Sequence, residues 1–272
     1  MMSEFLMGPA ILFCPADRPE RYAKAAGRAD AVIIDLEDAV AQENKGAARL
    51  ALRESCLDPA RTIVRVNPVD TGHFAKDLEA LQHTSYTTVM LPKAQSGAQP
   101  ARLADYDVVA LCETAAGIAH AAQIAAAENV VALMWGAEDL VASLGGTSSR
   151  HDDGSYRQVA SFARSQVLIH AAAQGKAAID SVYLDIPDSE GLFLESQDAK
   201  ASGFAAKASI HPSQMQIIRQ AYAPTAAEVQ LAKRILAEAE LHPGAFSLDG
   251  KMVDEPLLIQ ARATLDRAGN SA

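Results

Sequence analysis

The 272-residue sequence lacks an excess of positive charge. It holds 34 acidic residues against 24 basic ones, which gives a formal net charge of −10. Sequence-independent binding to nucleic acid or to an anionic membrane surface requires a cationic surface, so we expect neither as a partner. An anionic ligand would have to be held by a local group of basic side chains.

Cysteine is scarce as well. The three cysteines, Cys14, Cys56 and Cys112, are an odd number and show neither CxxC nor metal-finger spacing. This weighs against a disulfide framework and favours a reducing, cytoplasmic compartment. We expect all three to be buried and to pack as small apolar side chains.

Long apolar runs and phosphate-binding loops are absent. No stretch approaches the roughly 20 apolar residues that a membrane-spanning helix needs. The apolar run from Phe5 to Cys14 follows Glu4 and contains Gly8-Pro9, so its second half is predicted to be a strand rather than part of a signal peptide. Neither GxGxxG nor GxxxxGK[ST] occurs, which weighs against a dinucleotide- or nucleoside-triphosphate-binding enzyme.

The sequence does contain a regular alternation of segments. Short β-branched runs are each followed by a longer alanine-rich segment, a pattern typical of parallel strands joined by helical crossovers. The runs are Ala10–Cys14, Ala31–Leu36, Thr62–Asn67, Thr87–Leu91, Asp107–Glu113, Asn129–Trp135, Ile179–Leu184 and Ala205–Ile210. Eight strand–helix units predict an α/β fold, a (β/α)8 TIM barrel over residues 1–222, with an open doubly wound sheet as the alternative.

Residues 223–272 are extra to such a barrel. A helix is predicted from Pro224-Thr225 onward, and Pro256–Arg267 is predicted as a final helix. Between them, Asp249-Gly250 suits the turn of a two-residue hairpin that joins 246–248 to 251–253. This extension is longer than a cap requires, so we expect it to cover the barrel mouth or to reach a neighbouring subunit.

Polar residues follow nearly every predicted strand. In a TIM barrel the active site lies at the carboxyl ends of the strands. The residues at these positions are Asp17, Arg18, Asp35, Glu37, Asp38, Arg65, Asn67, Lys93, Glu113, Glu138, Asp139, Asp185, Asp188, Ser209 and His211. Each one alone could simply begin a polar loop, but the whole set favours a catalytic centre.

Arg65 is a charged residue inside a predicted strand. Alternation places Ile63, Arg65 and Asn67 on one face of that strand. A guanidinium that points into a barrel must be paired with carboxylates or must await an anionic ligand. We therefore predict that Arg65 faces a ligand.

Glu113 and Asp139 end the fifth and follow the sixth predicted strand, 139 − 113 = 26 residues apart. Adjacent strands would bring these carboxylates together, and a hard divalent cation accepts both. No His or Cys lies beside them, so an all-oxygen ligand set is expected. Such a set suits Mg²⁺, which keeps several waters and so leaves positions for a chelating substrate.

A short basic strip follows the first predicted strand. Asp17 is a plausible N-cap for the helix there, and Arg18, Arg21 and Lys24 then share one helix face. Near the barrel mouth this strip would suit phosphate groups, with a solvated helix face as the equal alternative.

Eight segments taken in order resemble one known family. They are Pro15–Arg21, Ile34–Val40, Arg65–Pro68, Leu91–Lys93, Glu113–Gly117, Gly136–Leu140, Ile210–Pro212 and Asp249–Asp254. Together they resemble the citrate lyase β-subunit-like branch of the HpcH/HpaI aldolase superfamily, which includes malyl-CoA and citramalyl-CoA lyases. The resemblance extends over nearly the whole chain.

The resemblance implies a Mg²⁺-dependent carbon–carbon lyase on a TIM barrel. Such an enzyme cleaves a 3-hydroxy-dicarboxylic acyl-CoA, such as citramalyl-CoA or malyl-CoA, to acetyl-CoA and a 2-keto acid (pyruvate or glyoxylate). It can also form the acyl-CoA from these two products.

The resemblance also implies roles for individual residues. Glu113 and Asp139 look like the metal ligands, and Arg65 looks like the active-site arginine. Glu37 and Asp38 resemble acids that order metal-bound water and the arginine, while Glu113 and Gly136 are expected to contact substrate. The remaining expected sites are Arg18, Arg21 and Lys24 for coenzyme A, and Asp254 for insertion into a neighbouring subunit's site, which implies a homo-oligomer, commonly a trimer.

Three other functions stay open. One is a related metal-dependent aldolase that uses free pyruvate or oxaloacetate. Another is a citrate lyase β-type subunit that acts on a citryl thioester within a larger complex. The third is a Schiff-base aldolase that uses Lys93, at the end of the fourth predicted strand.

Overall fold

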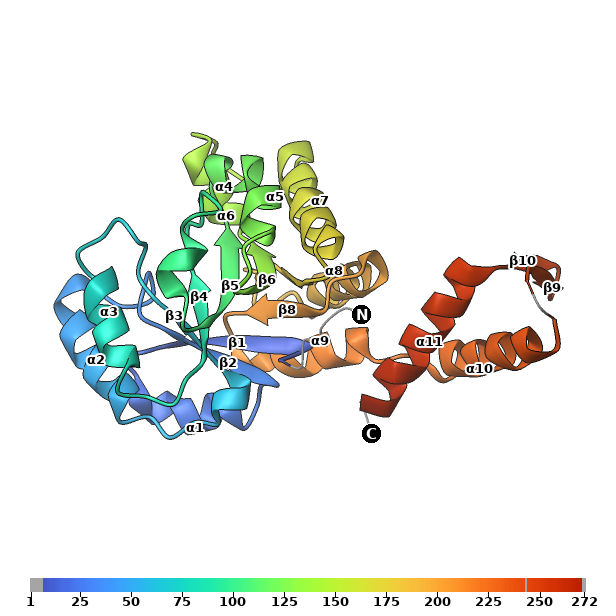
Figure 1. Ribbon diagram of the computed structural model, residues 1–272, viewed down its shortest axis with the longest axis horizontal. Coiled ribbons are helices and arrows are strands. Elements are labelled where there is room, and N and C mark those ends of the chain that lie inside the picture. The colour runs from blue at the N-terminus through green and yellow to red at the C-terminus, as the bar shows by residue number, and fades with distance from the viewer. Residues whose placement is uncertain (1–6, 243, 271–272) are drawn as a thin grey trace. The chain divides into compact units, whose positions relative to one another are not determined.

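The computed structural model describes residues 7–242 and 244–270 (Figure 1). The chain divides into two compact units, Met1–Ala221 and Tyr222–Ala272. Within the described residues, no helix is long and apolar enough to cross a membrane.

The first unit is a closed barrel of eight parallel strands in sequential order, with β8 paired to β1. This confirms the TIM barrel prediction. The strands are β1 (Ala10–Pro15), β2 (Ala31–Asp35), β3 (Thr62–Arg65), β4 (Thr88–Leu91), β5 (Asp107–Cys112), β6 (Val130–Trp135), β7 (Ala177–Asp180) and β8 (Ala206–Ser209).

Helices connect the strands and cover the outside of the barrel (Figure 1). They are α1 (Tyr22–Ala26), α2 (Lys45–Arg53), α3 (Phe74–Leu81), α4 (Ala115–Ala119), α5 (Ala121–Ala125), α6 (Ala137–Ser143), α7 (Gln158–Ala173), α8 (Ser189–Ser202) and α9 (Met215–Tyr222). Short 3₁₀ turns lie at Pro19–Arg21, Gln42–Asn44, Pro59–Arg61, Pro100–Leu103 and Pro212–Gln214.

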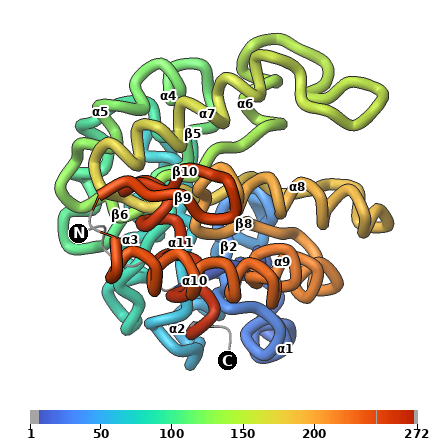
Figure 2. Tube along the Cα trace, turned by 90° about the vertical axis from the view of Figure 1, so that its right-hand side faces the viewer, coloured from blue at the N-terminus to red at the C-terminus, as the bar shows by residue number. Residues whose placement is uncertain are grey.

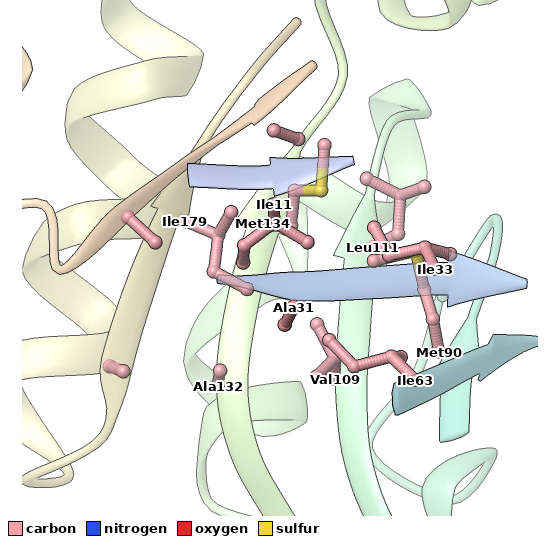
Figure 3. Close-up of a cluster of buried hydrophobic side chains, with 13 residues drawn as sticks. Ile11, Ala31, Ile33, Ile63, Met90, Val109, Leu111, Ala132, Met134 and Ile179 are labelled. Carbon is pink, nitrogen blue, oxygen red and sulfur yellow. The ribbon is translucent and has the colours of Figure 1, made fainter. Parts of the chain in front are cut away.

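Side chains fill the interior of the barrel, as Figure 3 shows. Every strand contributes to this cluster, from Ile11 on β1 to Ala208 on β8. Branched residues such as Ile33 and Ile63 lie among small ones such as Ala132, which lets side chains from facing strands fit together. The barrel is therefore a packed core, and its chemistry must lie at the strand ends.

The seventh strand begins two residues earlier than the sequence predicts and ends at Asp180 rather than Leu184. Ala177 and Ala178 have little strand propensity, whereas Val182, Tyr183 and Leu184 have much. Pairing with β6 overrides this local preference, since Ala177 and Ala178 pair with Ala132 and Leu133.

Two expectations near the first and third strands are wrong. Asp17 does not cap the first helix, because its carboxylate accepts a hydrogen bond from Asn44 and the chain enters a 3₁₀ turn at Pro19. Asn67 does not share the inner face with Arg65, because β3 ends at Arg65 and the regular alternation ends there. The Asn67 amide instead bonds Lys45 of α2 and Asp77 of α3, outside the barrel.

The cysteines follow the prediction in part. Cys14 and Cys112 are buried and unpaired, but Cys56 is exposed. It lies in the loop between α2 and the Pro59 turn, where its thiol donates to the Glu54 carbonyl.

A buried charge network joins β6, β7 and β8. Lys207 and Asp180 are both fully buried, and the Lys207 ammonium donates to Asp180, to the Ser181 carbonyl and to Glu195. Arg164 and the Trp135 indole also donate to Asp180. Although burial opposes it, the cations Lys207 and Arg164 hold the pKa of Asp180 at about 2. These contacts satisfy charges that would otherwise destabilise this side of the barrel.

The second unit contains α10 (Ala226–Leu241), the hairpin strands β9 (Phe246–Leu248) and β10 (Lys251–Val253), and α11 (Glu255–Asn270). The two helices pack against each other, and the hairpin connects them (Figure 2). The hairpin lies where the Asp249-Gly250 turn predicts it, with both turn residues at positive φ. Thr225 and Glu228 form a capping box at the start of α10.

Candidate active site

Arg65, at the end of β3, is held by two acids. Its Nε and Nη2 donate to the two carboxylate oxygens of Asp35 at 2.7 and 2.5 Å, and its Nη1 lies 3.1 Å from Glu37 Oε2. Asp35 and Arg65 are register partners on β2 and β3. Burial alone would lower the pKa of Arg65, but Asp35 and Glu37 raise it well above its ordinary value. The guanidinium is therefore a fixed permanent cation.

Glu37 is buried between two cations. Its carboxylate pairs with Lys93 Nζ as well as with Arg65. Burial raises the pKa of Glu37, while Arg65 and Lys93 oppose that rise. Oε2 lies within ion-pair distance of Arg65 but accepts no aligned hydrogen bond from the described residues.

A buried lysine behind the site holds the chain that carries Glu37. The Lys45 ammonium donates to the carbonyls of Leu36 and Glu37 at 2.7 and 2.8 Å and to Asn67 at 2.9 Å. Burial lowers the pKa of Lys45. These three bonds fix the backbone after β2, and thereby the direction in which Glu37 points.

Glu113 directly follows β5 and is almost fully buried. Its Oε1 accepts a hydrogen bond from the backbone N–H of Lys93 at 3.0 Å. Burial, then repulsion by Asp139 and Glu37, raises the pKa of Glu113 to about 8, although Arg65 and Lys93 oppose the rise. This carboxylate lies in an environment that disfavours its negative charge unless a further cation is supplied.

Asp139 lies in the first turn of α6, and 43% of its side chain is exposed. Its Oδ1 is 4.0 Å from Lys93 Nζ. No group of three or more His, Cys, Asp or Glu side chains within the described ranges has the arrangement of a complete metal site. Glu113 and Asp139 repel each other electrostatically, so the pair fits a divalent cation with two protein ligands and open positions for other oxygens.

The lack of a side chain at Gly136 leaves space for the Glu113 side chain. A Cβ built at Gly136 would lie 2.8 Å from Glu113 Cβ and 2.9 Å from Glu113 Oε2. A side chain at this position would therefore displace the carboxylate. Because it has no side chain, Gly136 can lie close to Glu113, a predicted metal ligand.

The other predicted residues are Asp38, the basic residues after β1, and Asp254. Asp38 is exposed and pairs with Lys93 at 3.1 Å. Arg18, Arg21 and Lys24 follow β1 at the same end of the barrel and are all exposed, with Arg18 and Arg21 near Asp17 and Glu20. Asp254 lies in the second unit, between β10 and α11, and is half-buried.

Sequence reasoning missed the roles of three residues. Asp35 stood among the strand-end acids, and its pairing with Arg65 could have been found from the β2–β3 register. For Lys93 the sequence suggests a strand-end position and an alternative role as a Schiff-base nucleophile, but not its pairing with several acids. The Lys45 contacts left no signal in the sequence, because that lysine begins an ordinary amphipathic helix.

A closed (β/α)8 barrel with an arginine and several acids at the carboxyl ends of its strands has the architecture of a TIM barrel enzyme. Residues 10–212 match the HpcH/HpaI aldolase/citrate lyase family. The chain belongs to this family, as the eight sequence segments predict.

Solved and curated relatives agree with this placement. The crystal structure of protein CitE from Mycobacterium tuberculosis, in complex with magnesium, acetoacetate and coenzyme A, matches with a TM-score of 0.94 and 56% identity, covering 97% of this chain and 98% of that one. A citrate lyase subunit beta-like protein from M. tuberculosis is 56% identical over 97% of both chains.

More distant relatives carry other names. A (3S)-malyl-CoA thioesterase from Cereibacter sphaeroides is 36% identical, over 95% of this chain and 94% of its own. The mitochondrial citramalyl-CoA lyase of Homo sapiens is 30% identical, over 95% of this chain and 85% of its own. Identity is higher to the two M. tuberculosis relatives, which places the chain in the citrate lyase β-like branch of the family.

We expect Gly136→Ala to weaken divalent-cation binding by about tenfold or more, because the new methyl group displaces Glu113 and changes around a metal ligand typically cost 10–100-fold in affinity. Titration of the purified protein with Mn²⁺, followed by electron paramagnetic resonance, measures this. Gly72→Ala is the matched control, since a Cβ there meets no atom within 4 Å. Equal Mn²⁺ affinity in folded Gly136→Ala and wild type would contradict the assignment.

Proposed function

We propose that this chain is a Mg²⁺-dependent carbon–carbon lyase. Its substrate would be a 3-hydroxy-dicarboxylic acyl-CoA such as citramalyl-CoA or malyl-CoA, cleaved to acetyl-CoA and a 2-keto acid, or formed from them. The observation that carries the proposal is the buried Glu113, whose pKa is raised to about 8 beside Asp139 and near the fixed cation Arg65. Relatives whose names include magnesium, coenzyme A and citramalyl-CoA support it.

Glu113 and Asp139 are the proposed metal ligands. A divalent cation between them would offset the repulsion that raises the pKa of Glu113. When bound, Mg²⁺ would act as a Lewis acid on the hydroxyl or keto oxygen at the bond that breaks or forms. Gly136 keeps the Glu113 carboxylate in place, and the Lys93 backbone N–H fixes its Oε1.

Arg65 is the proposed stabiliser of the negative charge that develops on the acetyl thioester oxygen. A guanidinium has five N–H donors; Asp35 takes two of them and Glu37 faces a third. Among the residues that the structure describes, this leaves two donors for a ligand. Because Asp35 fixes the orientation of the group before the reaction, little reorganisation is needed when charge develops.

A proton must also reach the carbon of the acetyl thioester when the bond is cleaved. Asp254 is the proposed donor, supplied by another subunit of an oligomer in which a trimer is favoured. Glu37 is the alternative within the same chain, because burial raises its pKa. Asp38 is the other alternative; it is exposed and, like Glu37, pairs with Lys93, and an acid already engaged with a cation is a poorer proton donor.

Coenzyme A is assigned to the basic side chains Arg18, Arg21 and Lys24, which follow β1 and are exposed. Their charges suit the phosphate groups of the cofactor on an otherwise acidic protein. The coenzyme would thus approach at the end of the barrel where Arg65 and Glu113 lie.

The geometry disfavours a Schiff-base mechanism. A lysine that forms a Schiff base must first lose its proton. Burial would lower the pKa of Lys93, but Glu37, together with Glu113 and Asp38, raises it well above its ordinary value. The Lys93 amine is therefore held as an ammonium.

The name of the C. sphaeroides relative makes thioester hydrolysis a second candidate function. Malyl-, citramalyl-, citryl- and hydroxymethylglutaryl-CoA, each assayed with Mg²⁺ and with EDTA, distinguish the two. We expect Mg²⁺-dependent release of acetyl-CoA and a keto acid from at least one of them, and none from Glu113→Gln. Release of free coenzyme A thiol without acetyl-CoA would favour the hydrolase, and failure to cleave any of the four would contradict the lyase.

The same assay separates two further alternatives. Turnover of free oxaloacetate or pyruvate adducts without coenzyme A would favour the aldolase that uses free acids. Activity of the purified chain on soluble coenzyme A thioesters would argue against a subunit that functions only inside a citrate lyase complex.

We expect Arg65→Lys to lower kcat by roughly 10²–10³, because lysine keeps the charge but loses the paired donors that bind Asp35 and the developing oxyanion. Steady-state kinetics with the best substrate of the panel measures the loss. Arg61→Lys is the matched control, since the Arg61 guanidinium donates only to the carbonyls of Ala29 and Asp30, just before β3 begins. Near wild-type kcat in Arg65→Lys would contradict the role.

We expect mixtures of Asp254→Ala and Arg65→Ala subunits, each inactive alone, to regain about one quarter of the wild-type activity after subunit exchange. In an equal mixture about half of the sites have an intact Arg65, and about half of those face an intact Asp254 of a neighbour. Exchange is checked by mass spectrometry of differently tagged subunits. Hybrids that exchange but stay inactive would count against a shared site and would favour Glu37.

A further inference from the structure

Lys93 contacts four acids of the site at once. Its backbone N–H donates to Glu113, and its ammonium pairs with Glu37 and with Asp38 at 3.1 Å and lies 4.0 Å from Asp139. The residue lies in the turn that follows β4 and has φ of +49°. Nothing in the lyase chemistry described above requires a lysine at this position.

We propose that Lys93 is a positioning residue that selects the ligands of the metal ion. Its ammonium keeps Glu37 and Asp38 from binding the ion, so that, of the four acids it contacts, Glu113 and Asp139 remain to bind it. This inference rests on the proposed function. The additional point is that Lys93 keeps open the coordination positions on the metal ion that the substrate needs.

The composition of the site creates the need for such a residue. Glu37, Asp38, Glu113 and Asp139 all interact with the Lys93 side chain or backbone, and carboxylates are preferred ligands of hard divalent cations. A metal that collected three or four of them would bind tightly but would have few positions for a chelating substrate. Arg65 and Lys93 together neutralise Glu37, while no described cation forms an ion pair as short as these with Glu113 or Asp139.

The backbone of Lys93 supports the same division of ligands. A non-glycine residue at positive φ is uncommon, and such residues concentrate at functional sites. Here the conformation accompanies an N–H that points at Glu113 Oε1, while the side chain reaches Glu37. Lys93 thus holds Glu113 in place through its backbone N–H and pairs with the carboxylate of Glu37 through its ammonium.

The ammonium also competes weakly with the ion for Asp139. Its charge lies 4.0 Å from Asp139 Oδ1, and a positive charge at this distance opposes the approach of another. Removal of the charge should therefore strengthen metal binding, but it should also change which carboxylates coordinate the ion. If Lys93 had a structural role alone, its loss would instead be expected to weaken metal binding.

The test is Mn²⁺ binding without substrate, on the full chain. Lys93→Met keeps the length of the side chain and the backbone preference but removes the charge. We expect about tenfold tighter Mn²⁺ binding by electron paramagnetic resonance and, by water proton relaxation, the loss of about one or more waters from the bound ion as Glu37 or Asp38 replaces them. The kcat for the acyl-CoA substrate should fall.

Two further variants complete the test. Lys93→Arg keeps a cation beside Glu37 and Asp38, and should retain the wild-type number of bound waters. Lys76→Met removes a charge from an exposed position on α3, and should leave the Mn²⁺ affinity and the water number unchanged.

The outcomes separate the two proposals. If wild type binds Mn²⁺ and Glu113→Gln does not, the metal site stands; unchanged or weaker affinity in Lys93→Met, or an unchanged water number, then overturns the role of Lys93 alone. If wild type binds no Mn²⁺, the proposed function and this inference are both overturned.

Discussion

The guanidinium of Arg65 lies at the end of a barrel strand with only 11% of its side chain exposed. A cation can be buried there chiefly because Asp35, its register partner on the neighbouring strand, accepts two hydrogen bonds from it, with Glu37 as a second ion-pair partner. The same Asp35 carboxylate also accepts the backbone N–H groups of Glu37 and Ala39. One acid therefore orients the arginine and the loop that brings Glu37 to it, and the geometry of the site follows from the β2–β3 register.

A second consequence is an uneven distribution of charge. Arg65 and Lys93 form ion pairs with Asp35, Glu37 and Asp38, whereas Glu113 stays buried with a raised pKa beside Asp139. In the network around Lys207 on β7, β8 and α8, Lys207 and Arg164 pair with Asp180, and Lys207 and Arg150 pair with Glu195. Thus one side of the barrel holds its charges in closed pairs for stability, and the other leaves one pair of acids in need of a cation. That difference is what distinguishes a binding site from a structural network.

The sequence was sufficient for the barrel because eight β-branched runs recur with helical spacing, and for the positions of Arg65, Glu113 and Asp139 at or just after strand ends. It was insufficient where tertiary contacts decide. Ala177 and Ala178 form a strand only through pairing with β6, and Asn67 turns outward because β3 stops at Arg65. The role of Lys93 depends on a backbone angle that residue type does not encode.

The second unit presents its acid in a defined conformation. Val253, directly before Asp254, is buried with Ala232, Ile235 and Ala261 in a small core of this unit. The Asp254 carbonyl accepts the N–H groups of Leu257 and Leu258 in the first turn of α11. A proton donor must be held in a fixed direction to be effective, and these contacts fix the backbone of Asp254 within its own unit. If Asp254 acts in a neighbouring subunit as proposed, this hairpin–helix junction is a suitable carrier, because only the docking of the unit, and no refolding, would be needed to place the carboxylate.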